Sequence, residues 1–107
     1  MYNIYPKVKQ QFNKEGLFTF NEVNLFCERN KNVFIDLYQV VKVNIVDEIN
    51  ANVKYQLKNE LEEQEYEITI NTDCVDVFAS SDVGFYYATK TLKQIFMNSQ
   101  IECGYIK

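Results

Sequence analysis

The stretch from Glu65 to Phe96, EYEITINTDCVDVFASSDVGFYYATKTLKQIF, constrains the fold of this chain more than any other. It opens with two short segments in which apolar and polar residues alternate, as they do in half-buried strands. The turn-forming residues Asn71, Thr72 and Asp73 separate the two segments. The pattern therefore predicts a β-hairpin with one apolar face and one mostly polar face.

The same stretch then changes to a helical period. Ser80, Ser81 and Asp82 offer side chains that cap the N-terminus of a helix. Gly84, in the first turn, lowers the helix propensity, which makes sense if the backbone must pass close to the sheet. The residues that follow place one buried stripe on the helix: Phe85, Ala88, Thr89, Leu92, Ile95 and Phe96.

The remaining elements are predicted from shorter patterns. The run from Val33 to Val46 is ambiguous, because its β-branched residues favour a strand while its spacing and length favour a helix. We expect a helix over about Lys31 to Val43. Alternation or extended character predicts strands in four further segments, LFTF, EVNLFCE, NVKYQLK and IECGYI. The element order is then β-β-α-β-β-β-α-β, an α+β domain with its helices packed on one face of the sheet.

Composition excludes several classes of protein. The chain has 107 residues, of which 47% are hydrophobic and 24% charged, as is usual for one globular domain. Its net charge of −4 argues against a nucleic-acid partner, because phosphate binding requires a basic face. No run approaches the ~20 apolar residues of a membrane span, and the N-terminal residues do not resemble a signal peptide. We expect a cytoplasmic location; if the sequence lacks its natural N-terminus, the location is unknown.

No catalytic constellation is visible in the sequence. Histidine, the commonest general base and metal ligand, is absent. Cys27, Cys74 and Cys103 lack the spacing of a zinc site, and we expect three free thiols. The acidic residues from Glu60 to Glu67 are typical of a solvated loop, where burial would not raise a carboxyl pKa. These observations favour a domain without catalytic activity and without cofactor or metal.

The hairpin and helix also resemble a known family. In the non-catalytic N-terminal domain of β-N-acetylhexosaminidases of glycoside hydrolase family twenty, a strand of the form Glu-x-Tyr-x-Leu-x-Ile is followed by a short turn and Ile-x-Ile-x-Ala. A polar cap, a glycine and an aromatic-rich helix ending in Thr-Leu-x-Gln-Leu come next, and the domain of family eighty-four is similar. Cys74 stands where the family usually has a glycine, a departure that concerns the turn and not the fold. The matching residues are Glu65, Tyr66, Ile68, Ile70, Val75, Val77, Ala79, Asp82, Gly84, Phe85, Tyr86, Ala88, Thr91, Leu92, Gln94 and Ile95.

The resemblance implies both a fold and a context. The fold would be a mixed β-sheet with two helices on one face, in a zincin-like topology without a metal site. Residues 1–107 would form a single accessory domain beside a (β/α)8 barrel of the same polypeptide. That barrel would remove terminal N-acetylhexosamine from glycans, using the acetamido group of the substrate and an Asp-Glu pair outside this chain. We therefore expect the polypeptide to continue past Lys107, where Ile101 and Ile106 fit the family's spacing before the barrel.

Two other functions remain open from the residues alone. One is a free-standing protein-interaction or inhibitor-like domain, such as a cystatin-like fold, with no enzymatic role. The other is a sugar-binding module, for which the polar sheet face offers only Phe78 as an aromatic platform. For the accessory domain we expect Tyr87, Ile35 and Phe78 to contact the barrel, because the first two project away from the apolar stripes of their helices.

Overall fold

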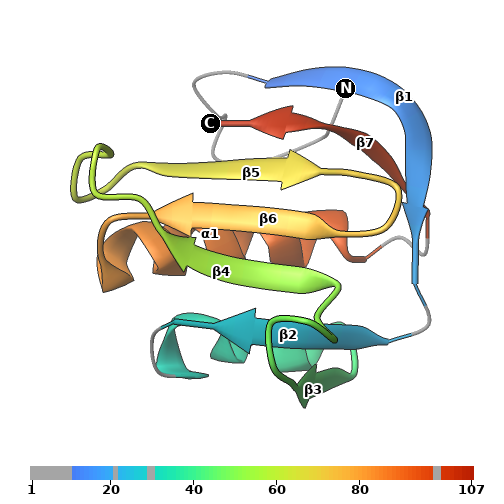
Figure 1. The fold of residues 1–107 in the computed structure, drawn as a ribbon, viewed down its shortest axis with the longest axis horizontal. Helices are drawn as coiled ribbons and strands as arrows, with labels where there is room; N and C mark the ends of the chain where they lie inside the picture. Colours follow the sequence, from blue (N-terminus) through green and yellow to red (C-terminus); the bar gives the residue numbers. More distant parts are fainter. Residues whose placement is uncertain (1–10, 21, 29–30, 98–99) are drawn as a thin grey trace.

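The computed structural model of the protein describes residues 11–20, 22–28, 31–97 and 100–107, and Figure 1 shows their arrangement. Within these residues seven strands form one mixed sheet in the order β1-β7-β5-β6-β4-β2-β3. The pairs β2–β3, β2–β4 and β4–β6 are parallel, and the others are antiparallel. The strands are β1 (Gln11–Thr19), β2 (Val23–Cys27), β3 (Val43–Ile45), β4 (Val53–Leu57), β5 (Tyr66–Ile70), β6 (Val75–Ala79) and β7 (Gln100–Ile106).

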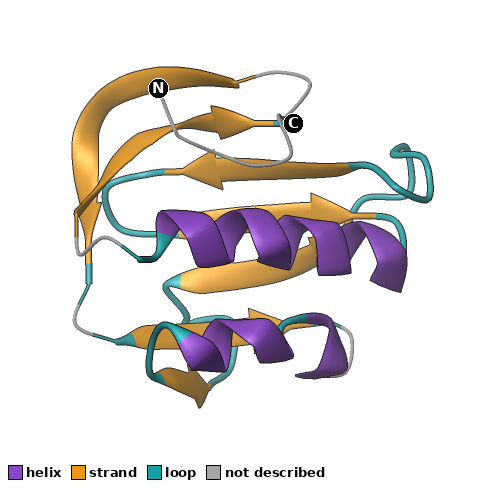
Figure 2. Ribbon diagram, turned by 180° about the vertical axis from the view of Figure 1, so that it is seen from behind, coloured by secondary structure: helices purple, strands orange, loops and turns teal. Residues whose placement is uncertain are grey.

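The helical elements cover one face of this sheet. The helix α1 (Asp82–Ile95) and the 3-10 helices η1 (Lys31–Val33) and η2 (Ile35–Gln39) all lie in front of the strands in Figure 2. The opposite face carries no helix among the residues described. The α+β class and the mixed sheet are therefore confirmed, and the core lies between the sheet and these helical elements.

The predicted hairpin is present as β5 and β6. Its register runs from Tyr66 opposite Ala79 to Ile70 opposite Val75. The backbone N–H of Asn71 donates to the carbonyl of Cys74 at 2.8 Å and closes the turn. The apolar positions of both strands are buried under α1: Ile68, Ile70, Val75, Val77 and Ala79. The alternation in the sequence was thus sufficient to assign the two faces of the hairpin.

The N-terminus of α1 packs very closely against the hairpin and the loop before it. The hydroxyl of Ser81 accepts from the backbone N–H of Gly84 at 3.4 Å and donates to the carbonyl of Glu63 at 2.6 Å. A Cβ placed on Gly84 would lie 2.5 Å from the carbonyl oxygen of Glu65 and 2.9 Å from the Cβ of Ala79. The close approach expected from the glycine is confirmed, and only a residue without a side chain fits there.

The expectation of a helix over residues 31–43 was wrong. The structure has two 3-10 helices within residues 31–39, the strand β3 begins at Val43, and α1 is the one α-helix of the described residues. The carbonyl of Val33 accepts from the side chain of Thr89 at 2.7 Å, while the N–H of Leu37 donates to Phe34 at 3.0 Å. The i to i+4 bond from the N–H of Leu37 to the carbonyl of Val33 is therefore replaced by an i to i+3 bond. The β-branched residues Val43 and Ile45 then pair in the strand β3.

Thr89 belongs to a buried network that joins three elements. Its hydroxyl also lies 2.9 Å from the carbonyl of Phe85, and the hydroxyl of Tyr55 lies 2.6 Å from it. Because the Thr89 proton is directed to a carbonyl, Tyr55 is the donor in the bond between the two hydroxyls. Burial strongly raises the pKa of Tyr55, so this phenol stays protonated. The network fixes η1 and β4 to α1 inside the core.

We predict that Gly84→Ala destabilises the protein by about 1–3 kcal/mol, because the new methyl group must displace backbone. In an open helix the same change would stabilise by about 1 kcal/mol, so the sign of the effect tests the close approach. Urea unfolding followed by circular dichroism measures it. Val83→Ala, at the exposed neighbouring position, serves as the control and should change stability little. A Gly84→Ala protein as stable as the parent would contradict this packing.

Candidate functional site

The described residues contain no group of three or more His, Cys, Asp or Glu side chains that could bind a metal ion. Glu60, Glu62 and Glu63 are exposed, as expected for a solvated loop, although Leu61 between them is buried and anchors the loop to the core. Cys27 and Cys74 are half-buried, Cys103 is buried, and all three are thiols.

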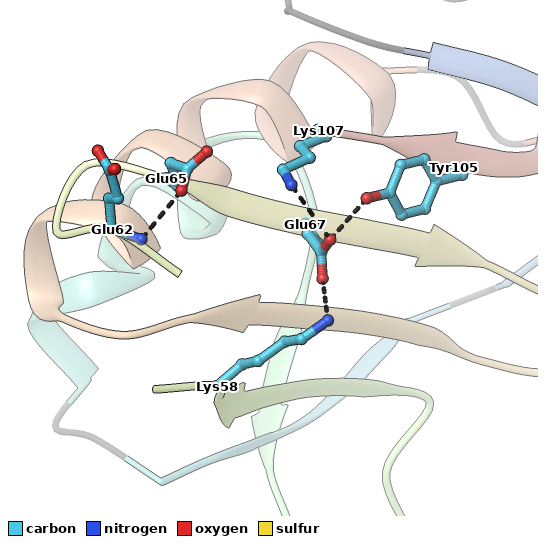
Figure 3. Close-up of polar contacts among 6 residues, drawn as sticks. All are labelled: Lys58, Glu62, Glu65, Glu67, Tyr105 and Lys107. Carbon is cyan, nitrogen blue, oxygen red and sulfur yellow. Dashed lines mark hydrogen bonds and ion pairs between the residues drawn. The ribbon is translucent and has the colours of Figure 1, made fainter. Parts of the chain in front are cut away.

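One carboxylate departs from this pattern. Glu67 lies on the polar face of β5, and only 9% of its surface is exposed. One carboxylate oxygen accepts from the ammonium of Lys58 at 2.6 Å, and the other accepts from the hydroxyl of Tyr105 at 2.6 Å. Lys107 forms a longer ion pair with it, at 3.8 Å. Figure 3 shows these groups converging on Glu67 from the end of β4 and from β7.

The protonation states within this cluster are fixed by its geometry. Burial alone would raise the pKa of Glu67, but the hydrogen bonds from Lys58 and Tyr105 outweigh it and hold that pKa below its usual value. Burial and the bond to Glu67 raise the pKa of Tyr105 to about 12. The carboxylate is thus ionised at neutral pH, and its oxygens are occupied. Glu67 has the properties of a structural anion and not those of a general acid.

No local pattern in the sequence predicts this cluster. Glu67 was placed with the acidic loop and the solvated sheet face, whereas the structure nearly buries it. Its partners are 9, 38 and 40 positions away along the chain, counting from Lys58, Tyr105 and Lys107. The only local signal is a glutamate between Tyr66 and Ile68 in a strand, which is ordinary for an alternating pattern.

Tyr87 and Ile35 lie on the opposite side of the molecule, where the helical elements cover the sheet. Their side chains are 45% and 49% exposed, as expected from the helical stripes. They belong to a group that we call the helix-side apolar surface. Its members are the exposed apolar residues of η2, β3 and α1: Ile35, Tyr38, Ile45, Val83, Tyr86 and Tyr87.

A groove lies on this helix-side surface, between η1 and the first half of α1. Its volume is about 560 Å³. The rings of Tyr86 and Tyr87 meet edge to face with their centroids 6.0 Å apart, and the ammonium of Lys90 lies 4.7 Å from the centre of the Tyr86 ring. The groove thus combines aromatic faces with charged ends. Its lining residues are Asn32, Val33, Asp82, Val83, Tyr86, Tyr87 and Lys90.

Phe78, the third residue expected to contact the barrel, lies on the other face of the sheet. It alternates with the buried Val77 and Ala79 on β6, and it is paired across the strands with Glu67. The ammonium of Lys58 lies 5.8 Å from the centre of its ring, so this aromatic belongs to the polar cluster. The structure therefore brings Tyr87 and Ile35 onto one surface and does not bring Phe78 there.

A comparison with protein families matches the whole chain. Residues 1–107 fit the model described as "Glycosyl hydrolase family 20, domain 2". The chain belongs to this family. The non-catalytic N-terminal domain expected from the hairpin and helix is thereby confirmed. No curated protein matches the sequence.

Solved structures share the fold of this family 20 domain. The β-N-acetylhexosaminidase from Bacteroides fragilis NCTC 9343 matches with a TM-score of 0.83 and 22% identity, over 96% of this chain and 24% of its own. A family 20 exo-β-N-acetylglucosaminidase from Vibrio harveyi matches with a TM-score of 0.79 and 17% identity, over 96% and 18%. A chitobiase from Flavobacterium johnsoniae matches with a TM-score of 0.74 and 18% identity, over 98% of this chain and 20% of its own. The domain spans a quarter or less of each relative.

Within the ranges that the structure describes, no helix is both long enough and apolar enough to cross a bilayer.

We predict that the stability of the protein depends on the ionisation of Glu67. Its pKa is lower in the folded state than in the unfolded state, so the stabilisation is present above the unfolded pKa and is lost as the pH falls through the folded pKa. Glu67→Gln should cost about 1 kcal/mol at pH 7, after allowance for screening by solvent. The difference from the parent should shrink towards about pH 3. Urea unfolding at a series of pH values measures both, and a difference independent of pH would contradict the assignment.

Proposed function

We propose that this chain is the accessory domain of a β-N-acetylhexosaminidase-like glycoside hydrolase. A (β/α)8 barrel elsewhere in the same polypeptide would remove terminal N-acetylhexosamine from glycans. The observation that carries the proposal is the match of all 107 residues to a domain that fills a quarter or less of the length of the hexosaminidases sharing its fold.

The same proposal includes the finer description of the fold. Residues 1–107 form a single domain with the zincin-like topology that the resemblance implies. The mixed sheet, with one α-helix and two 3-10 helices on the same face, supports this topology. Family membership favours the accessory domain over a free-standing interaction or inhibitor-like domain.

We further propose that the helix-side apolar surface contacts the barrel. The exposed large apolar residues of η2 and α1 all lie there, and Ile45 of β3 joins them because its register partner Leu25 faces the helices. The other sheet face carries polar side chains such as Lys54, Gln56 and Asp76. An exposed apolar area rimmed by polar groups is typical of a protein–protein or interdomain contact. Most of each relative's chain lies outside this domain, which supplies the occupant.

The first experiment tests the activity. The full-length protein encoded by the natural gene should hydrolyse p-nitrophenyl N-acetyl-β-glucosaminide, whereas residues 1–107 alone should not. Turnover by the isolated chain that survives repurification and disappears on mutation of one of its carboxylates would overturn the proposal. A natural gene that ends directly after Lys107 would also overturn it and favour the free-standing domain.

The second experiment tests the surface in the full-length protein. Tyr87→Asp places a charge in the proposed contact and should separate the domains, because burying an unpaired carboxylate is costly. Calorimetry should then show two unfolding transitions where the parent shows one. Phe78→Asp makes the matched change on the opposite face and should leave a single transition. Separation by Phe78→Asp but not by Tyr87→Asp would contradict the assignment of the surface.

A further inference from the structure

The strands β1 and β7 form an arm at one edge of the sheet. In the part of the chain that the structure describes, β1 pairs with β7 and with no other strand. The first half of β7 pairs only with β1, and β7 meets β5 at three positions, Gly104, Tyr105 and Ile106. We call residues 11–19 and 100–107 the β1–β7 arm. Its backbone attachment to the rest of the sheet is short.

Gly16 gives the arm its bend. The register of β1 against β7 shifts between Asn13 and Leu17, and Gly16 lies within that shift with a φ of 104°. This left-handed conformation disfavours any residue with a side chain. The bend is visible in Figure 1, where β1 curves around the end of β7. In the same view the second half of β1 runs across the direction of the central strands.

Side chains attach the arm at its two ends in different ways. At one end the rings of Phe18 and Phe20 pack on Phe96 at the end of α1, with centroids 6.4 and 5.1 Å away. At the other end Tyr105 and Lys107 contact Glu67 of β5. The first attachment is apolar and insensitive to charge. The second consists of a charge-assisted hydrogen bond and an ion pair that share one carboxylate.

The body of the domain also holds this carboxylate. Lys58, just after β4, donates to Glu67 and lies over Phe78 of β6, so the anion is tied to β4 as well as to β5. The titratable groups facing Glu67 among the residues described are thus Lys58, Tyr105 and Lys107. At longer range, the charge of Glu60 raises the pKa of Lys58, and the charge of Glu65 raises the pKa of Tyr105.

We propose that Glu67 is a latch: its carboxylate holds the β1–β7 arm on the sheet, and its loss lets the arm open as a unit while the body stays folded. The body here comprises β2 to β6 and α1. Without the carboxylate, the hydroxyl of Tyr105 and the ammonium of Lys107 lose their charged partner on β5. Three backbone register positions and the buried side chains of Phe18, Ile101 and Ile106 then hold the arm. Local opening of one such unit can require less free energy than global unfolding.

The chain contains a reporter of this opening. Cys103 lies on β7 and is 2% exposed. The sulfur of Cys103 lies close to Gly16 of β1, because a Cβ placed on Gly16 would be 3.6 Å from it. The two strands of the arm therefore cover this thiol together with the sheet. Cys27 lies on β2, in the body, and is half-buried. Modification of Cys103 therefore reports the arm, and modification of Cys27 reports the body.

The experiment compares thiol labelling of the full-length protein carrying Glu67→Gln, Glu48→Gln or no change. Iodoacetamide at pH 8 is followed by peptide mass spectrometry, and each cysteine is compared only with itself across variants. Glu67→Gln should label Cys103 up to roughly fivefold faster, in line with a loss of about 1 kcal/mol, with Cys27 unchanged. Glu48→Gln removes the same charge from an exposed turn and should change neither rate.

Three further measurements make the outcome decisive. Circular dichroism checks that each variant is folded. Tyr105→Phe, which removes one donor and keeps the carboxylate, should accelerate the labelling of Cys103 by a smaller factor than Glu67→Gln does. Hydrogen exchange of Glu67→Gln should increase in residues 11–19 and 100–107 and not in α1. Equal acceleration at Cys103 and Cys27, which indicates global unfolding, would overturn the latch, as would unchanged labelling of Cys103.

Discussion

The close packing of α1 on the β5–β6 hairpin is the constraint on which the rest of the structure depends. Gly84 brings the helix axis so near the sheet that a single methyl group would overlap the carbonyl of Glu65. Ser80 and Ser81 tie the preceding loop to the same place through the carbonyls of Glu62 and Glu63. The direction of α1 across the sheet is thereby set at its first turn. Everything that α1 buries or presents to solvent follows from that direction.

One buried hydrogen-bond network extends this constraint to the first half of the chain. Because α1 lies where it does, Thr89 reaches the carbonyl of Val33 and the hydroxyl of Tyr55. Buried polar groups must be paired, so the backbone around Val33 adopts the shape that meets Thr89. That shape is a pair of 3-10 helices, and the chain then returns to the sheet as β3. The network specifies local structure that propensity alone leaves undecided.

The two faces of the molecule differ in chemistry for the same reason. The helical elements bury one side of the sheet and leave their own outer residues, including Tyr87 and Ile35, as an apolar surface. The other side is polar. There Glu67 accepts hydrogen bonds from Lys58 and Tyr105 and forms an ion pair with Lys107, and these contacts join the central strands to β7. The domain thus has one side whose exposed surface is largely apolar. Its other side stabilises the sheet itself.

The sequence by itself determined the hairpin, the helix α1, the glycine at the close approach and the family, because each depends on local periodicity, turn chemistry or motif spacing. It also placed Tyr87 and Ile35 at exposed positions. Tertiary structure alone decided the 3-10 helices over residues 31–39, the burial of Glu67 and the separation of Phe78 from Tyr87. These features depend on contacts such as Thr89 with Val33 and Glu67 with Tyr105, between positions far apart in the chain. Local patterns do not encode such contacts, since the partners meet only after the sheet has assembled and α1 has packed on it.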